Sequence, residues 1–334
     1  MNAVRALVLG CAGLSLLFSS IEADANECAK TLPDNAVGSQ IVRAAIKEYA
    51  SFNGHRIDTA GRLWKFGSTE TENESLLNAV TGEPDSSDAR HLAWRRVWEY
   101  WLVLDRHVPS VALSRKVIAH PGALDGDAED RTATEKTLRE LFARLALEPS
   151  DVNESLRQAA LRAALSDSPW SAAFISYVMH EAGLSDEQFR YAAAHWQYVK
   201  QAFGTDSRRI YRACDPRHTP PREGDLLCYS RGSRAPENFE EWLIAVTRPG
   251  FTAASHCEIV VLVDRTASKM ETVGGNVLQS IAMRRLKLNG NGLLSASHYT
   301  GNTIRRMPSA CAKDKSCREW DSNTQRWSVL LKLR

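Results

Sequence analysis

A helix with a serine in its first turn is predicted by the stretch Ser168-Pro169-Trp170-Ser171-Ala172-Ala173-Phe174-Ile175-Ser176-Tyr177. Ser168 is a suitable N-cap residue, Pro169 fits the first helical position, and Gly183 ends the helix. Ser171 then lies where free backbone N–H groups and the helix dipole stabilise developing negative charge. This position suits a nucleophile with an oxyanion site beside it. The apolar residues at helical spacing form one buried stripe: Trp170, Ala173, Phe174, Tyr177 and Val178.

Two downstream segments add a histidine and an asparagine to this serine. His256 lies at the start of the apolar run Ser255-His256-Cys257-Glu258-Ile259-Val260-Val261, and Asn276 lies in Val273-Gly274-Gly275-Asn276-Val277. A helix-borne nucleophile, a strand-borne base and a polar residue that orients the base are the parts used in nucleophilic hydrolysis. We therefore interpret Ser171, His256 and Asn276 as a candidate catalytic set.

Each of these positions also has a purely structural interpretation. Ser171 can satisfy backbone groups at the helix N-terminus, because serine is common there. His256 can be a core histidine that hydrogen-bonds a carbonyl group, and Gly274-Gly275-Asn276 fits a tight turn. The order and spacing of the three positions together favour the catalytic interpretation.

Four segments resemble the bacterial family called domain of unknown function 2272: PWSAAFISYVMHEAG (169–183), GDLLCYSR (224–231), SHCEIVV (255–261) and VGGNV (273–277). The resemblance extends over about 38–104 and 166–300. The same motifs are similar to those of CHAP and NlpC-type cell-wall hydrolases. That similarity implies a papain-like α+β core, in which the helix that carries Ser171 packs on an antiparallel sheet that carries His256.

The resemblance to the hydrolases has two departures. Ser171 stands where they have the nucleophilic cysteine, and Gly274 stands where they have an acidic orienter, which leaves Asn276 as the polar candidate. We expect Trp170, His195, Asp225 and Gly275 to contribute to substrate binding. The alternative for Asp225 is a turn cap, and the alternative for His195 is packing beside its aromatic neighbours Tyr191, Trp196 and Tyr198.

The chain divides into four predicted parts. Residues 1–25 have the charge, the apolar run and the A-x-A site of a signal peptide. Residues 26–105 are predicted as an N-terminal helical part, with helices at about 39–54 and 91–104, and residues 106–166 as a helical insertion. Residues 167–334 are the papain-like core, with strands at about 225–229, 258–264, 269–273 and 327–331. Helices first and strands last indicate an α+β fold.

Composition and motifs exclude several function classes. The chain has 334 residues and a formal charge of +2, which excludes a polyanion binder that depends on bulk charge. The basic cluster Arg284, Arg285 and Lys287 is too small to indicate nucleic-acid binding. The sequence lacks HExxH, CxxC, P-loop and GxGxxG motifs, so we expect neither a metal nor a cofactor. No continuous apolar segment after the predicted signal peptide is long enough to insert stably in a membrane.

The cysteines indicate an oxidising compartment. Six remain once Cys11 is removed with the signal peptide, and an even number in an exported chain favours disulfides. Cys311 and Cys317 are predicted to pair across a small polar loop. Cys228 and Cys257 are predicted to face each other on neighbouring strands; the alternative is that both are buried free thiols.

These observations lead to a functional hypothesis with two rivals. The chain is predicted to be periplasmic or secreted, and to act as a serine-type amidohydrolase or peptidase on peptidoglycan or its peptide stems. The alternative is a catalytically inactive papain-like module that binds peptidoglycan or an envelope protein. The third hypothesis is a structural protein of the envelope.

Overall fold

The computed structural model describes residue Cys28 and residues 36–72, 92–109, 111, 162–166, 168–232, 235–300, 304–306 and 318–334. The predicted signal peptide, most of the predicted insertion 106–166 and the predicted pair Cys311 and Cys317 lie outside the described residues.

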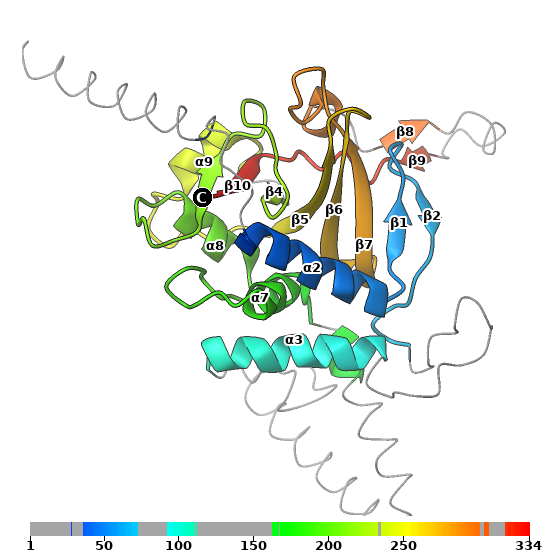
Figure 1. The fold of residues 1–334 in the computed structure, drawn as a ribbon, viewed down its shortest axis with the longest axis vertical. Helices are drawn as coiled ribbons and strands as arrows, with labels where there is room; N and C mark the ends of the chain where they lie inside the picture. Colours follow the sequence, from blue (N-terminus) through cyan, green and yellow to red (C-terminus); the bar gives the residue numbers. More distant parts are fainter. Residues whose placement is uncertain are drawn as a thin grey trace, which may run out of the picture.

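An eight-stranded sheet forms the centre of the structure, in the order β2-β1-β7-β6-β5-β4-β10-β3 (Figure 1). Every pair of neighbours is antiparallel except β1 and β7, which are parallel. A separate pair of short strands, β8 and β9, is antiparallel. The strands are β1 (His55–Ile57), β2 (Leu63–Lys65), β3 (Tyr211–Cys214), β4 (Leu226–Ser230), β5 (Ser255–Asp264), β6 (Lys269–Val277), β7 (Ser280–Lys287), β8 (Ile304–Arg306), β9 (Arg318–Trp320) and β10 (Val329–Leu333).

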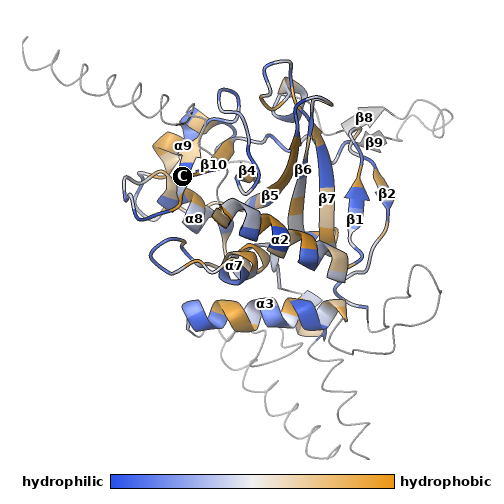
Figure 2. Cartoon of the chain, viewed as in Figure 1, coloured by the Kyte–Doolittle hydropathy of each residue, from blue (hydrophilic) through white to orange (hydrophobic). Residues whose placement is uncertain are grey.

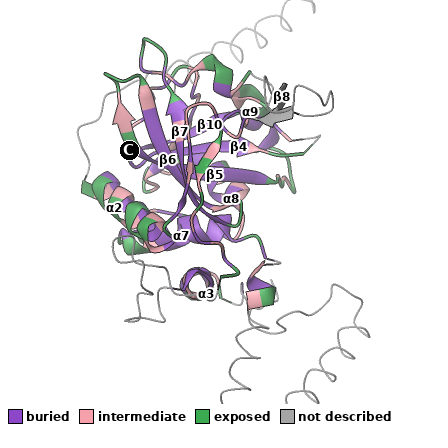
Figure 3. Ribbon diagram, turned by 90° about the vertical axis from the view of Figure 1, so that its right-hand side faces the viewer, coloured by how far each residue is buried: buried purple, intermediate pink, exposed green. Residues whose placement is uncertain are grey.

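Helix α7 (Ser171–Glu181) lies between the sheet and helix α3 (Ala93–His107), and it packs on β5 and β6 (Figures 1 and 3). Helix α2 (Ala36–Ser51) packs beside α7 on the same strands. Because α7 is covered from both sides, it is apolar over most of its surface (Figure 2). The remaining helices are α8 (His195–Ala202), α9 (Phe239–Ala245) and the 3₁₀ helix η2 (Ala296–His298).

The predicted α+β class is confirmed, with the helix that carries Ser171 packed on a mainly antiparallel sheet. The papain-like assignment stays a prediction. Alternate residues of β4 face opposite sides of the sheet, as the strand geometry requires. Leu226 and Cys228 join the core under the helices, whereas Leu227 and Tyr229 join a second apolar cluster on the other face.

Two details of the prediction are corrected. The segment 26–105 is not only helical, because it also contributes β1 and β2 to the sheet. Strands of three residues are too short to show alternation, although Asp58 and Gly61 are typical of the turn between them. The Asp58 carboxylate accepts hydrogen bonds from the backbone N–H groups of Ala60 (2.8 Å) and Arg62 (3.0 Å), and Gly61 has a φ of 76°.

The second correction concerns the start of α7, which begins at Ser171 rather than at Pro169. Trp170 is the N-cap residue, and its carbonyl accepts the first helical hydrogen bond, from the backbone N–H of Phe174 (2.9 Å). The indole of Trp170 is fully buried between the rings of Phe52 and Tyr100, and it donates a hydrogen bond to Glu70. These contacts hold Trp170 outside the helix, so Ser171 is the first helical residue.

Candidate active site

The hydroxyl of Ser171 is hydrogen-bonded to a histidine, and that histidine is His195. Ser171 Oγ lies 2.7 Å from His195 Nε2. Ser171 begins α7 and His195 begins α8, so two helix starts bring the pair together. Ser171 is 7% exposed and His195 3% exposed, so the bond is buried. An electrostatic interaction is stronger there than in water.

Tyr198 holds the other side of the His195 ring. Its hydroxyl is hydrogen-bonded to His195 Nδ1, from one helical turn further along α8. When His195 carries its proton on Nδ1, that N–H donates to Tyr198 and Nε2 accepts the proton of Ser171. Burial lowers the pKa of His195 well below its usual value, and the neighbouring His256 and Arg231 lower it further. The imidazole is therefore neutral at neutral pH and available as a base.

His256 is the second histidine of the site, and it contacts His195 rather than Ser171. The two imidazole rings are 5.1 Å apart between centroids. Cys257 joins the core under the helices, so its neighbour His256 faces the other side of the sheet with its register partner Tyr229. His256 is the second residue of β5, so its ring lies near the end of the strand, where it meets His195 at the start of α8. Burial lowers the pKa of His256, although Glu258 opposes this effect.

Glu258 is a buried carboxylate two residues after His256 on the same face of β5. Its Oε1 lies 3.5 Å from His256 Nε2. Arg284 of β7 binds both carboxylate oxygens (3.0–3.1 Å), and the hydroxyl of Thr272 donates to Oε2 (2.6 Å). Burial would raise the pKa of Glu258, but the Arg284 guanidinium and His256 outweigh it and hold the pKa at about 2. Glu258 is therefore ionised.

Two adjacent glycines of β6 make room for this arrangement. A Cβ atom on Gly274 would lie 2.6 Å from Cγ of Glu258, and one on Gly275 would lie 2.6 Å from the side chain of Phe174 on α7. Because Gly274 has no side chain, the Glu258 carboxylate fits against one face of the sheet. Because Gly275 has none, α7 packs closely on the other face.

The residues of this site fall within a recognised protein family. A family model described as "Uncharacterized protein conserved in bacteria (DUF2272)" matches residues 88–333. The chain belongs to this family. No curated protein and no solved structure matches the chain significantly. The part of this DUF2272 protein that matches the family includes Ser171, His195, His256, Glu258 and Arg284.

Asp225 is used within the fold of this DUF2272 protein. Its fully buried carboxylate accepts hydrogen bonds from the backbone N–H groups of Arg222 (2.7 Å) and Leu333 (2.9 Å), and it pairs with Lys332 (3.0 Å). Asp225 precedes β4, whereas His256 pairs with Tyr229 four positions further along, about 13 Å away. The contact with Arg222 is the turn cap that was the alternative interpretation.

Asn276 lies where β6 is irregular, between Gly274 and Val277, with a φ of 53°. Asparagine tolerates this left-handed backbone better than most residues do. Within the described ranges its side chain makes no hydrogen bond to His195 or His256. Of the predicted substrate contacts, Trp170 and Gly275 flank α7, and their role in binding stays a prediction.

The sequence contained two signals for the residues that complete this site. His195 and Tyr198 are three positions apart on a helix, which places the hydroxyl beside the imidazole. His256 and Glu258 are two positions apart on a strand, which places both on one face. Neither spacing predicts the contact between Ser171 and His195. That contact depends on how α7 and α8 are placed relative to each other, which is a tertiary feature.

The predicted disulfide between Cys228 and Cys257 is confirmed. The two residues are register partners on β4 and β5, with Cα atoms 4.1 Å apart. A second disulfide joins Cys28 to Cys214 on β3. It links residues from distant parts of the chain, so spacing along the sequence did not predict it.

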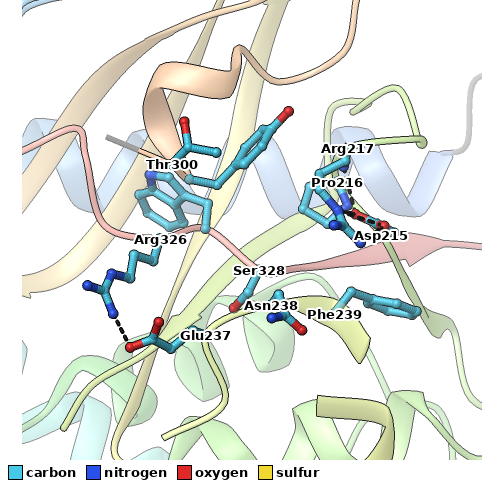
Figure 4. A pocket seen from close by; sticks show the side chains of 11 residues that line it. Asp215, Pro216, Arg217, Glu237, Asn238, Phe239, Thr300, Arg326 and Ser328 are labelled. Carbon is cyan, nitrogen blue, oxygen red and sulfur yellow. Dashed lines mark hydrogen bonds and ion pairs between the residues drawn. The ribbon is translucent and has the colours of Figure 1, made fainter. Parts of the chain in front are cut away.

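A cavity of about 330 Å³ lies beside Trp327 (Figure 4). Its charged side chains are paired with one another: Arg217 binds Asp215 (2.6 Å), and Arg326 binds Glu237. Trp327 belongs to the apolar cluster on the sheet face away from α7, so this cavity is separate from the Ser171 hydroxyl. In the described part of the chain, no three acidic, histidine or cysteine side chains are grouped to hold a metal ion, and no helix is long and apolar enough to span a membrane.

Proposed function

We propose that this protein is an exported serine-type hydrolase of peptidoglycan amide bonds, with Ser171 as nucleophile and His195 as general base. The observation that carries the proposal is the 2.7 Å contact between Ser171 Oγ and His195 Nε2 at the start of a buried helix. His195 takes the role that the sequence prediction gave to His256. Glu258, His256 and Tyr198 surround this pair as supporting groups.

The geometry supports a two-step acyl transfer. Ser171 attacks the amide carbonyl while its proton passes to His195 Nε2. The oxyanion that forms is stabilised by the free N–H groups in the first turn of α7. His195 then protonates the leaving amine, which breaks the C–N bond and leaves an acyl ester on Ser171. Water, deprotonated by His195, hydrolyses this ester and restores the serine.

The proposed compartment and substrate rest on three observations. The disulfides Cys28–Cys214 and Cys228–Cys257 are of the kind that persists in oxidising compartments. Residues 1–25 have the sequence features of a signal peptide. The motifs around Ser171 and His256 resemble those of cell-wall hydrolases, and peptidoglycan is the abundant amide polymer of the bacterial envelope.

Reactivity of Ser171 tests the proposal directly. An alkyl fluorophosphonate forms a bond to an activated serine oxygen with loss of fluoride, and mass spectrometry locates the adduct. We expect labelling at Ser171 in the wild type, none in Ser171→Ala, and a rate at least about 100-fold lower in His195→Ala. Release of new amino groups from purified peptidoglycan should follow the same pattern, and the double variant should be little worse than either single one.

The exposed histidine His218 provides the control. It pairs with Asp215 at the surface, so His218→Ala should label and turn over as the wild type does. Asn276→Ala should have a small effect, since the Asn276 side chain makes no hydrogen bond to His195 or His256 in the described part of the chain. Wild-type protein that is folded, unlabelled and inactive on peptidoglycan would refute hydrolysis.

The burial of Ser171 favours a second candidate function, a binding module without turnover. A serine residue that is 7% exposed is shielded from a large polymer unless neighbouring groups move. This candidate predicts that the wild type co-sediments with insoluble peptidoglycan but releases nothing from it, and that Ser171→Ala binds equally well.

A further inference from the structure

The second histidine of the site leaves one nitrogen without a hydrogen bond. Among the residues that the structure describes, the buried His256 Nε2 has no hydrogen-bond partner, and the nearest acidic oxygen there, Glu258 Oε1, is 3.5 Å away. Buried polar atoms without partners are rare, because each forfeits the hydrogen bond that it had in water. A small movement of either side chain would close this gap and give His256 a carboxylate acceptor.

The carboxylate cannot easily move away from its position. Arg284 binds both oxygens and Thr272 binds one of them, so Glu258 is held from the adjacent strand β6 and from β7 beyond it. Gly274 leaves the space that the Glu258 side chain fills, since a Cβ atom there would collide with it. The result is a fixed negative charge beside His256, whose ring contacts His195.

We infer that Glu258 is a positioning residue of the proposed hydrolase, which acts on His195 through His256. The inference rests on the proposed function for its kinetic part. When Ser171 gives its proton to His195, the new imidazolium lies in a buried site beside His256 and Arg231. The carboxylate, held by Arg284, offsets part of the positive charge there and fixes His256 with its proton on Nε2. In this step one proton passes from Ser171 Oγ to His195 Nε2, and neither His256 nor Glu258 gains or loses a proton.

Several charged or titratable groups face the two histidines and set the pH dependence. Negative charge comes from Glu258 alone among those described, and positive charge comes from two arginines. Removing the negative charge should therefore lower the pKa of the histidines further. The groups are Tyr198 of α8, Tyr229 of β4, Arg231 after β4, Glu258 of β5 and Arg284 of β7.

The pH dependence of Ser171 phosphonylation distinguishes two roles for Glu258: positioning the histidines, or only stabilising the fold. We expect Glu258→Gln to slow labelling of Ser171 by about 100-fold, less than the about 10⁴-fold loss known for a carboxylate in direct contact with a catalytic histidine. The acidic limb of its profile should move to lower pH, and Glu258→Asp should recover part of the rate. An unchanged rate and profile in a folded Glu258→Gln variant would overturn the inference.

Glu271 is the matched control for this experiment. It forms a similar cross-strand pair with Arg285 (2.7 Å) between β6 and β7, and it is also buried. Glu271→Gln removes a carboxylate from an ion pair of the same kind without a histidine beside it. We expect its labelling rate and pH profile to match the wild type, whereas a change equal to that of Glu258→Gln would overturn the specific role of Glu258.

A measurement on wild-type protein keeps the inference testable if Glu258→Gln does not fold. Nitrogen NMR of labelled histidines reports which ring nitrogen carries the proton. We expect His256 to be neutral with its proton on Nε2, and a proton on Nδ1 alone would overturn the inference. This result does not depend on turnover. Absence of Ser171 labelling in the wild type would instead refute the proposed function.

Discussion

Glu70 is a buried acid that contacts the residue immediately before Ser171. Its carboxyl group accepts a hydrogen bond from the indole of Trp170, and its backbone N–H donates to Gln279 at the tip of the β6–β7 hairpin (2.8 Å). Burial raises the pKa of Glu70 to about 7, although the Trp170 hydrogen bond opposes this effect. Glu70 thus gains a charge near neutral pH, close to the start of α7.

The raised pKa of Glu70 predicts a pH-dependent stability. A carboxyl group whose folded pKa exceeds its unfolded pKa stabilises the protein fully below about pH 4.5, and this contribution is lost as pH rises to about 7. We expect Glu70→Gln, which keeps an acceptor for Trp170, to be more stable than the wild type at pH 8 by about 1–3 kcal/mol. At pH 4 the two should be equal.

Urea unfolding at a series of pH values measures this difference. Glu72→Gln is the control, because Glu72 lies two residues further on the same segment but is exposed. The free energy of unfolding of Glu72→Gln, plotted against pH, should run parallel to that of the wild type. If Glu70→Gln raised the free energy of unfolding by the same amount at pH 4 and pH 8, the raised pKa of Glu70 would not be its cause.

At the scale of single residues, the sequence singled out Ser171 more readily than the histidine that contacts it. Ser171 stands out because its position in the first turn of a helix depends on local sequence. His195 was identified only as a candidate for substrate contact, since its distance to Ser171 depends on how α7 and α8 meet. The predicted base, His256, lies beside His195, and Glu258 was not singled out because its acceptor role arises from the space at Gly274.

Contact between α7 and β6 depends on a missing side chain. A methyl group on Gly275 would lie 2.6 Å from Cβ and Cγ of Phe174, which is fully buried in the core. Gly275→Ala should therefore force the helix away from the strand and lower the free energy of unfolding by about 1–3 kcal/mol. The same shift would move Ser171 relative to His195, so labelling of Ser171 should also slow.

Gly290 is the matched control for this substitution. A Cβ atom there would meet nothing within 4 Å, so Gly290→Ala should change the stability by less than about 0.5 kcal/mol. Chemical unfolding of both variants provides the comparison. Equal stability of Gly275→Ala and the wild type would show that the helix packs less closely than described.

Strands with a clear apolar run were predictable from the sequence, whereas the eight-residue strand β7, which carries Arg284, Arg285 and Lys287, and the short strands were not. The strands 225–229, 258–264, 269–273 and 327–331 correspond to β4, β5, β6 and β10, because their apolar runs are bounded by turn residues. β1 and β2 have three residues each, and they form a sheet only because β7 offers a free edge. The exact start of α7 depended on the burial of Trp170, which is a tertiary contact.

The disulfide between Cys28 and Cys214 joins the N-terminal region to the sheet across 186 residues. Closing so long a loop removes more entropy from the unfolded chain than closing a short one. Cys28→Ser should therefore lower the free energy of unfolding by about 2–5 kcal/mol. Thermal melting with and without reductant checks this, because the variant should lose the part of the reductant effect that this bond contributes.

The cross-strand pair Cys228 and Cys257 provides the internal comparison. Both residues are fully buried, so this disulfide should survive reductant in the folded protein and react only after unfolding. Mass spectrometry after alkylation follows each pair separately. Rapid alkylation of Cys257 in the folded wild type would contradict its position in the core.

The parallel pairing of β1 with β7 constrains when the molecule can be assembled. Arg56 is 227 residues ahead of its register partner Met283, so β1 has no strand to join while most of the chain is still on the ribosome. Contacts of such long range slow folding, because the chain must close a large loop before it gains their stabilisation. The N-terminal edge of the sheet can therefore form only after β7 has been synthesised. Late assembly of this edge is compatible with the export that we propose, since a secretion channel accepts only an extended polypeptide.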